Sequence, residues 1–132
     1  MGEEAIGPHV QAFITERIDS VMQLELLLLL AARADRAPTP ADLAAELRID
    51  PAWVETQLRE MAGHGLLELA DGTPPQFRYR PRTAELARTV ADLAQAYTDR
   101  RVTVIGLIFS KPVDKLRSFA DAFRLRKDRP DG

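Results

Sequence analysis

Several residue types that carry enzyme chemistry are absent or scarce in this sequence of 132 residues. It contains no cysteine, which excludes disulfide bonds, thiolate nucleophiles and cysteine metal ligands. Its two histidines, His9 and His64, stand far apart, and neither has a partner at metal-ligand spacing. No serine has a histidine and a carboxylate placed around it by a motif, and no glycine-rich phosphate loop occurs. We therefore expect a protein that is not an enzyme and binds no cofactor or metal.

Long apolar runs are absent as well. The longest covers residues 26–32, far short of the roughly 20 residues that a membrane-spanning helix needs. The first residues are acidic and lack the basic start and apolar core of a signal peptide. The net charge is −2, so binding to a polyanion by overall charge alone is excluded, whereas a local basic surface is not. We expect a cytoplasmic protein without membrane contact.

What the sequence does contain is a series of helical patterns. Apolar residues at helical spacing predict an amphipathic helix over residues 9–18. Strong helix formers predict a second helix over residues 21–34. Five successive leucines, at positions 26–30, cover the whole circumference of this second helix. We therefore expect it to be buried on several sides and to form the centre of the domain.

Two cap-and-proline signals introduce the next pair of helices. Pro40 and Pro51 each follow a residue that caps helices well, and proline suits the first helical position. The expected helices cover residues 40–47 and 51–62 and are separated by a turn of three residues. This is the spacing of a helix-turn-helix.

The pattern then changes to alternation. Residues 66–69 and 76–80 are typical of two short strands, and the turn-forming residues 71–75 between them indicate a hairpin. A single long helix is expected over residues 84–109, because one apolar stripe stays in phase along it. The β-branched residues 102–105 favour a strand locally.

A last helix is expected over residues 110–123, with Leu116, Phe119, Ala120 and Phe123 turned inward. A charged tail follows it. Residues 99–132 carry a net charge of +4. This basic portion can contact phosphates or pair with the acidic body of a second subunit.

The stretch Leu58-Arg59-Glu60-Met61-Ala62-Gly63-His64-Gly65-Leu66-Leu67 resembles the L-x-x-L-x-x-x-G-L-[ILV] join between recognition helix and wing in winged-helix regulators. The similarity covers residues 20–80 and is best for the MarR-type group, whose flanking helices form a dimer interface. It implies a mainly α fold with a small β-hairpin wing. The winged helix-turn-helix domain would cover residues 20–82, between an N-terminal dimer arm at 1–19 and a dimerisation part at 83–132.

In such a fold the second helix of the pair enters the major groove of DNA. Ala52, Thr56 and Arg59 are expected to point outward, and Glu55 and Gln57 to lie on the two flanks of this face. Arginine suits guanine, glutamine suits adenine, and a glutamate accepts from cytosine N4. Residues 39–64, however, hold two arginines against five carboxylates, a net charge of −3. Plain solvent exposure of this face therefore stays open beside base contact.

The second strand of the expected wing is basic. Arg78, Arg80 and Arg82 alternate with apolar residues, and residues 76–82 include no acid. Because strand alternation places Arg78 and Arg80 on one face, they can contact phosphates or the minor groove. The alternative is a solvated outer face of a hairpin whose aromatic side belongs to the core.

The apolar stripe of the long helix predicts a homodimer, since one small domain would leave it exposed. The residues expected at this interface are Phe13, Ile14, Leu86, Val90, Leu93, Tyr97 and Val104. Together these features predict a homodimer that binds double-stranded DNA and regulates transcription.

The alternative is a winged-helix adaptor that has lost DNA binding. In that case the acidic residues 39–64 and Trp53 would bind a basic protein partner. Packing of Trp53 inside its own domain is the simpler interpretation of this single tryptophan.

Overall fold

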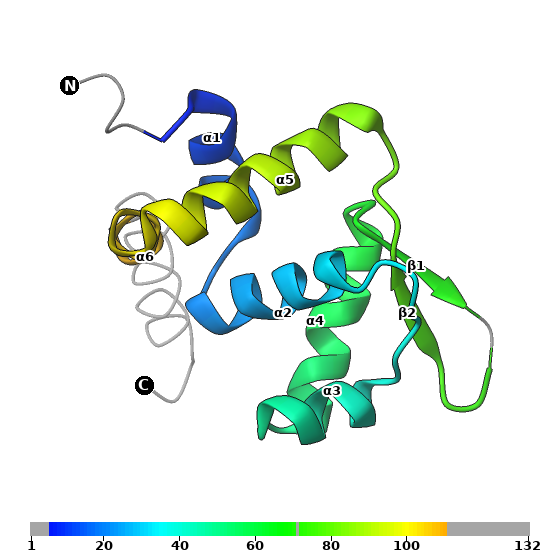
Figure 1. Ribbon diagram of the computed structural model, residues 1–132. Helices are drawn as coiled ribbons and strands as arrows, with labels where there is room; N and C mark the ends of the chain where they lie inside the picture. The colour runs from blue at the N-terminus through cyan, green and yellow to red at the C-terminus, as the bar shows by residue number, and fades with distance from the viewer. Residues whose placement is uncertain (1–5, 71, 111–132) are drawn as a thin grey trace, which may run out of the picture.

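The computed structural model describes residues 6–70 and 72–110. Within these ranges the chain is mainly helical and carries one two-stranded antiparallel hairpin. In chain order the elements are α1 (Pro8–Arg17), α2 (Val21–Ala32), α3 (Pro40–Leu47), α4 (Pro51–Gly63), β1 (Leu67–Ala70), β2 (Gln76–Tyr79), α5 (Ala84–Asp99) and α6 (Arg101–Phe109). Figure 1 shows the hairpin and α6 at opposite ends of the molecule. The expected mainly α fold with a hairpin wing is confirmed.

Side-chain caps fix where four of the helices begin. Ser20, Asp50 and Thr83 each accept a hydrogen bond from the backbone N–H three residues further on. Thr39 and Asp42 form a complete capping box, in which each side chain accepts from the other residue's N–H. A cap of this kind contributes about 1 kcal/mol, because it satisfies an N–H that the helix leaves unpaired. The start signals in the sequence thus place these helices.

The central helix of the core is α2. Leu26 and Leu27 are wholly buried and Leu30 nearly so, whereas Leu28 and Leu29 are half-buried. In Figure 1, α5 crosses above α2 and α4 passes behind it. The expectation that α2 is buried on several sides is confirmed, because all five leucines at positions 26–30 are buried or half-buried.

The apolar stripe expected to remain exposed is covered by the chain itself. Val90, Leu93, Tyr97 and Val104 of this stripe are buried and Leu86 is half-buried, and Phe13 and Ile14 of α1, also expected at the interface, are buried as well. The expectation that one domain cannot cover this stripe is wrong. The physical reason is that α1 packs against both α5 and α6, while α2 contacts α5.

The prediction of a single helix over residues 84–109 is also wrong, because the chain bends at Arg100. This residue has φ −139° and ψ 54°, which ends α5 and separates it from α6. The bend lets Val104 and Ile108 reach the core next to α1, where both are buried. The β-branched residues 102–105, which favour a strand locally, lie within α6 and are helical. The last helix expected over 110–123 lies outside the described residues.

Candidate nucleic-acid interface

The turn between α3 and α4 is set by local backbone geometry. Arg48 adopts the left-handed conformation, with φ 60° and ψ 49°, and ends α3. The N–H of Ile49 then donates to the carbonyl of Ala44 at 3.1 Å. Asp50 follows at once as the cap of α4 and accepts from the N–H of Trp53 at 2.9 Å. This three-residue turn lets α3 and α4 pack against each other as a helix-turn-helix.

The outward face of α4 is the one that the sequence predicts. Val54, Leu58 and Met61 are buried against the core. The exposed positions are Pro51, Ala52, Thr56, Arg59, Glu60 and Gly63, and the half-buried ones are Trp53, Glu55, Gln57 and Ala62. The small side chains of Ala52 and Thr56 leave room for another molecule to approach the first half of the helix.

Two charged side chains on α4 are joined to each other. Arg59 donates from Nε to Glu55 Oε2 at 3.0 Å, and its Nη2 lies 2.9 Å from the same oxygen. The guanidinium carbon also lies 5.8 Å from the centre of the Phe77 ring on β2. The pair therefore sits where α4 meets the hairpin, and the charge of Glu55 is balanced locally.

Gln57 is held by the helix behind it. Its Oε1 accepts from Gln23 Nε2 at 2.7 Å, and Gln23 Oε1 in turn accepts from the N–H of Asp19 at 2.7 Å. Because a backbone N–H can only donate, this order fixes both amides. The paired donor and acceptor that adenine requires are therefore not both free on Gln57, which acts here as a link between α4 and α2.

A glycine joins α4 to the hairpin. Gly65 is buried and has φ +81°, a conformation that other residues rarely adopt. A Cβ atom there would lie 3.2 Å from Nε of Arg82. The carbonyl of Gly65 also accepts from the N–H of Arg82 at 2.7 Å. The end of the hairpin is thus fastened to the end of α4.

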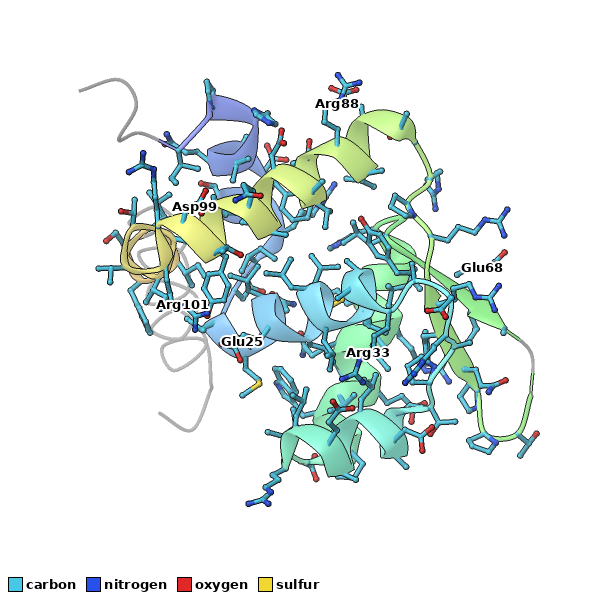
Figure 2. All side chains as sticks on the ribbon, viewed as in Figure 1. Glu25, Arg33, Glu68, Arg88, Asp99 and Arg101 are labelled. Atoms are coloured by element: carbon cyan, nitrogen blue, oxygen red, sulfur yellow. The ribbon has the colours of Figure 1, made fainter. Side chains whose placement is uncertain are left out.

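The hairpin carries its arginines on the outside. Phe77 is wholly buried, and its N–H donates to the carbonyl of Pro38 at 3.0 Å. Arg78 and Arg80 are exposed, as expected from strand alternation. Glu68, labelled on the hairpin in Figure 2, pairs in register with Arg78, and its Oε1 lies 3.5 Å from Nη1 of Arg80.

Glu68 was not among the residues expected at this site. It lies on β1, outside the acid-free stretch 76–82, and only the strand register brings it beside the arginines. Counting outward from the turn of the expected hairpin would have placed it opposite Arg78. The wing is therefore less positive than its second strand alone indicates.

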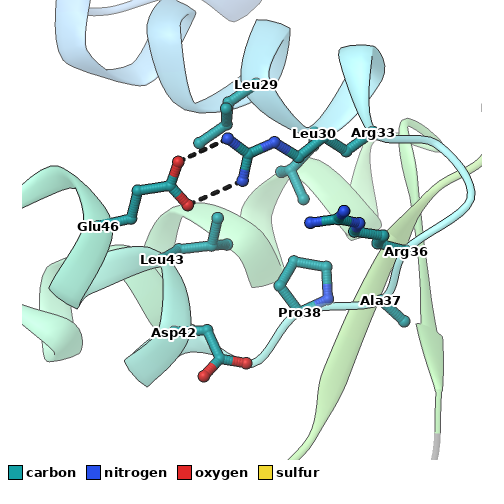
Figure 3. A pocket seen from close by; sticks show the side chains of 9 residues that line it. All are labelled: Leu29, Leu30, Arg33, Arg36, Ala37, Pro38, Asp42, Leu43 and Glu46. Carbon is teal, nitrogen blue, oxygen red and sulfur yellow. Dashed lines mark hydrogen bonds and ion pairs between the residues drawn. The ribbon is translucent and has the colours of Figure 1, made fainter.

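A pocket of about 330 Å³ lies between the end of α2 and α3 (Figure 3). Leu29, Leu30 and Leu43 contribute apolar side chains to its lining. Arg33 donates to both carboxylate oxygens of Glu46, at 2.8 and 2.6 Å. This hydrogen-bonded pair lowers the pKa of the Glu46 carboxyl. The pair of Arg33 and Glu46 also links the end of α2 to α3, the first helix of the helix-turn-helix.

The two histidines lie in different parts of the fold. His9 Nε2 lies 2.7 Å from Asp92 Oδ2, which links α1 to α5, and His64 follows the end of α4. Among residues 6–70 and 72–110, no group of three or more potential ligand side chains could hold a metal ion. In the same ranges no helix is both long and apolar enough to cross a bilayer.

Comparison with solved structures relates this fold to winged-helix transcriptional regulators. A mutant of MarR from E. coli, complexed with operator DNA, superposes with a TM-score of 0.51 at 14% identity, covering 87% of this chain and 82% of that one. A mutant of MepR from S. aureus, bound to an oligodeoxyribonucleotide, gives 0.50 at 12% identity, with 90% of each chain covered. A mutant of ZitR from Lactococcus lactis gives 0.50 at 18%, covering 86% and 79%.

No family model and no curated protein sequence matches the chain. The similarity is therefore one of structure. The fold of this chain is like that of the MarR structure, and the region around α3, α4 and the hairpin is a winged helix-turn-helix.

Proposed function

We propose that this protein regulates transcription as a homodimer that binds operator DNA and performs no catalysis. The observation that carries the proposal is the contact between α4 and the hairpin. The exposed face of α4 borders the hairpin, because Arg59 lies over the ring of Phe77 on the inner side of β2 and the N–H of Arg82 bonds to the carbonyl of Gly65. The fold shared with MarR and MepR, both solved with DNA, supports the same conclusion.

In this proposal α4 enters the major groove with its first half leading. Ala52 and Thr56 allow close approach, and Arg59 has donors that suit guanine. Arg78, Arg80 and Arg82 of the hairpin contact phosphates on either side. Phosphate contacts supply affinity and orientation, whereas base contacts from α4 supply the choice of sequence.

Local ion pairs reduce the repulsion between the acidic side chains of the proposed interface and the phosphates of DNA. The carboxylate of Glu55 is balanced by Arg59, and that of Glu68 lies near Arg80. Within α4, β1, β2 and residues 80–82 the charged residues are four arginines and three glutamates: Arg59, Arg78, Arg80, Arg82, Glu55, Glu60 and Glu68. These elements thus carry one more positive than negative charge, and phosphate contacts by the arginines should give an affinity that falls with salt.

The second copy is expected at α6. Val102 on this helix is 84% exposed and Phe109 is 59% exposed, which is unusual for large apolar side chains. A two-fold dimer through α6 would bury both and place two recognition helices on a symmetric DNA site. We therefore propose the dimer interface at α6 and not at the stripe of α5, which is buried within the chain.

Fluorescence anisotropy with a labelled random-sequence duplex, titrated at several salt concentrations, tests the proposal. Wild-type protein should bind, and Arg78→Ala should weaken binding to all sequences and reduce the salt slope by about one. Arg88→Ala is the matched control, since Figure 2 shows Arg88 projecting from α5 on the side opposite α2. A wild-type protein without salt-dependent affinity for any duplex would contradict the proposed function.

A protein-binding adaptor is the second candidate, favoured by the net charge of −3 over residues 39–64. Trp53 is half-buried and packs against the core, so only part of its ring is available to a partner. In this case the duplex titration fails, and binding to a basic protein surface is lost on Glu55→Lys and Glu60→Lys substitution.

A further inference from the structure

The pair formed by Glu55 and Arg59 has an unusual distribution of free hydrogen-bonding groups. Both contacts from Arg59 go to one oxygen, Glu55 Oε2. Among the described residues, no side chain donates to the other oxygen, Oε1. Three further N–H groups of the guanidinium, on Nη1 and Nη2, are also uncommitted. The pair thus offers one acceptor beside several donors.

The side chains of Glu55 and Arg59 are accessible to solvent, and that of Arg59 is held in place by a neighbouring ring. The Glu55 side chain is 42% exposed and that of Arg59 is 51% exposed, so both can be reached from solvent. The ring of Phe77 lies under the guanidinium at 5.8 Å and restricts its position. The two residues are four positions apart on a helix of 13 residues, on the side that borders the hairpin.

The chemistry of this arrangement matches one base pair best. In the major groove, a C·G pair places the N4–H₂ donor of cytosine beside the O6 and N7 acceptors of guanine. Glu55 Oε1 can accept from cytosine while Arg59 donates to both guanine acceptors. An A·T pair also has a donor beside an acceptor, but thymine offers only O4 and adds a methyl group.

The pairing also explains how a carboxylate can approach DNA. An isolated glutamate in the groove would be repelled by the phosphates and would lose its hydration. With Arg59 bonded to Oε2, the pair has no net charge, and the second oxygen remains available. Arg59 is therefore needed both for its own contact and for that of Glu55.

We propose that Glu55 and Arg59 act together to select a C·G base pair in each half of the DNA site. This inference rests on the proposed function, because it assumes that α4 enters the major groove. It assigns the choice of base to an ion pair, whereas Arg78, Arg80 and Arg82 contribute affinity without sequence preference.

Selection from a duplex library with randomised positions, followed by sequencing, measures base preference separately from affinity. We expect wild-type protein to enrich cytosine at one position per half-site, and replacement of that C·G pair by T·A to weaken binding about tenfold or more. Glu55→Ala and Arg59→Ala should each abolish this preference. Glu60→Ala, on the same helix, is the control and should retain it.

The outcomes separate this inference from the proposed function. If wild-type protein binds no member of the library, the proposed function fails and the inference with it. If wild-type protein binds but Glu55→Ala tightens binding to all sequences equally, Glu55 only repels DNA and the inference alone is overturned. Enrichment of A·T, or an unchanged C·G preference in either variant, overturns it as well.

Both alanine variants should remain folded, because the replaced side chains are 42% and 51% exposed and alanine is a strong helix former. Circular dichroism at the selection temperature checks this. The double variant supplies a further readout, since two residues that act as one unit lose no more preference together than singly.

Discussion

The hydroxyl of Tyr97 donates a hydrogen bond to Glu25 Oε2 at 2.8 Å, which ties the last turn of α5 to α2. The guanidinium of Arg101 lies 4.5 Å from the centre of the same ring. Figure 2 shows Glu25 and Arg101 on the same side of the molecule, near the beginning of α2. Three helices therefore meet at one phenol, directly beside the bend at Arg100.

Tyr97→Phe should lower the free energy of unfolding by about 1–2 kcal/mol, because it removes a part-buried hydrogen bond to a charged group. Urea unfolding measures the loss. Tyr79→Phe is the control, since the Tyr79 ring is only half-buried on the hairpin. Equal losses in the two variants would show that the contact with Glu25 contributes nothing.

Alkaline pH should destabilise the protein through both of its tyrosines. Burial raises the pKa of Tyr79 to about 12, and burial together with the bond to Glu25 raises the pKa of Tyr97. An unfolded phenol ionises near pH 10, so unfolding releases protons above that value. The stabilisation is complete below about pH 10 and is lost as pH rises through the folded-state pKa values.

Unfolding midpoints in urea at pH 8 to 11.5 check this expectation. We expect a constant midpoint at the lower values and a decline above pH 10. Tyr79→Phe should make the decline shallower, because one of the two groups is then missing. A decline of the same steepness in wild type and in this variant would contradict the assignment to Tyr79.

Disruption of the α6 surface should dissociate the proposed dimer. Val102→Asp with Phe109→Asp places charges on two exposed apolar positions, so the core of each chain stays intact. Sedimentation equilibrium should give the dimer mass for wild type and the monomer mass for the double variant. Thr103→Asp, at an exposed polar position of α6, should leave the dimer unchanged. A dimer mass in the double variant would place the interface elsewhere.

The starts of the helices could be predicted because their signals are local. Thr39, Asp50 and Thr83 cap helices through the next three residues, and such contacts need no tertiary structure. The turn between α3 and α4 and the outward face of α4 follow from the same short-range rules. These features define the winged helix-turn-helix and most of its candidate interface.

The remaining features depend on contacts between distant residues. The bend at Arg100 serves the packing of Val104 and Ile108 near α1, which lies about 90 residues earlier in the chain. In the sequence, an apolar stripe covered by α1 looks the same as one covered by a second subunit. The register of Glu68 opposite Arg78 can be counted from the turn, but its ion pair with Arg80 depends on how the two side chains reach across the hairpin.

Two glycines at the end of α4 offer a matched pair of substitutions. Gly65→Ala should lower the free energy of unfolding by about 1–2 kcal/mol, because φ +81° is strained for alanine and the new Cβ would lie 3.2 Å from Arg82. At Gly63 a Cβ has open space around it and a helical backbone. Gly63→Ala should therefore raise the free energy of unfolding by about 0.5 kcal/mol.

Thermal and urea unfolding of the two variants measure both changes. The join between α4 and the hairpin also orients the arginines, so Gly65→Ala should weaken duplex binding more than its stability loss explains at low temperature. Gly63→Ala should keep wild-type affinity, even though its methyl group lies on the exposed face of α4. If the two substitutions lower stability equally, loss of a glycine at this helix end is the cause and the left-handed backbone of Gly65 is not.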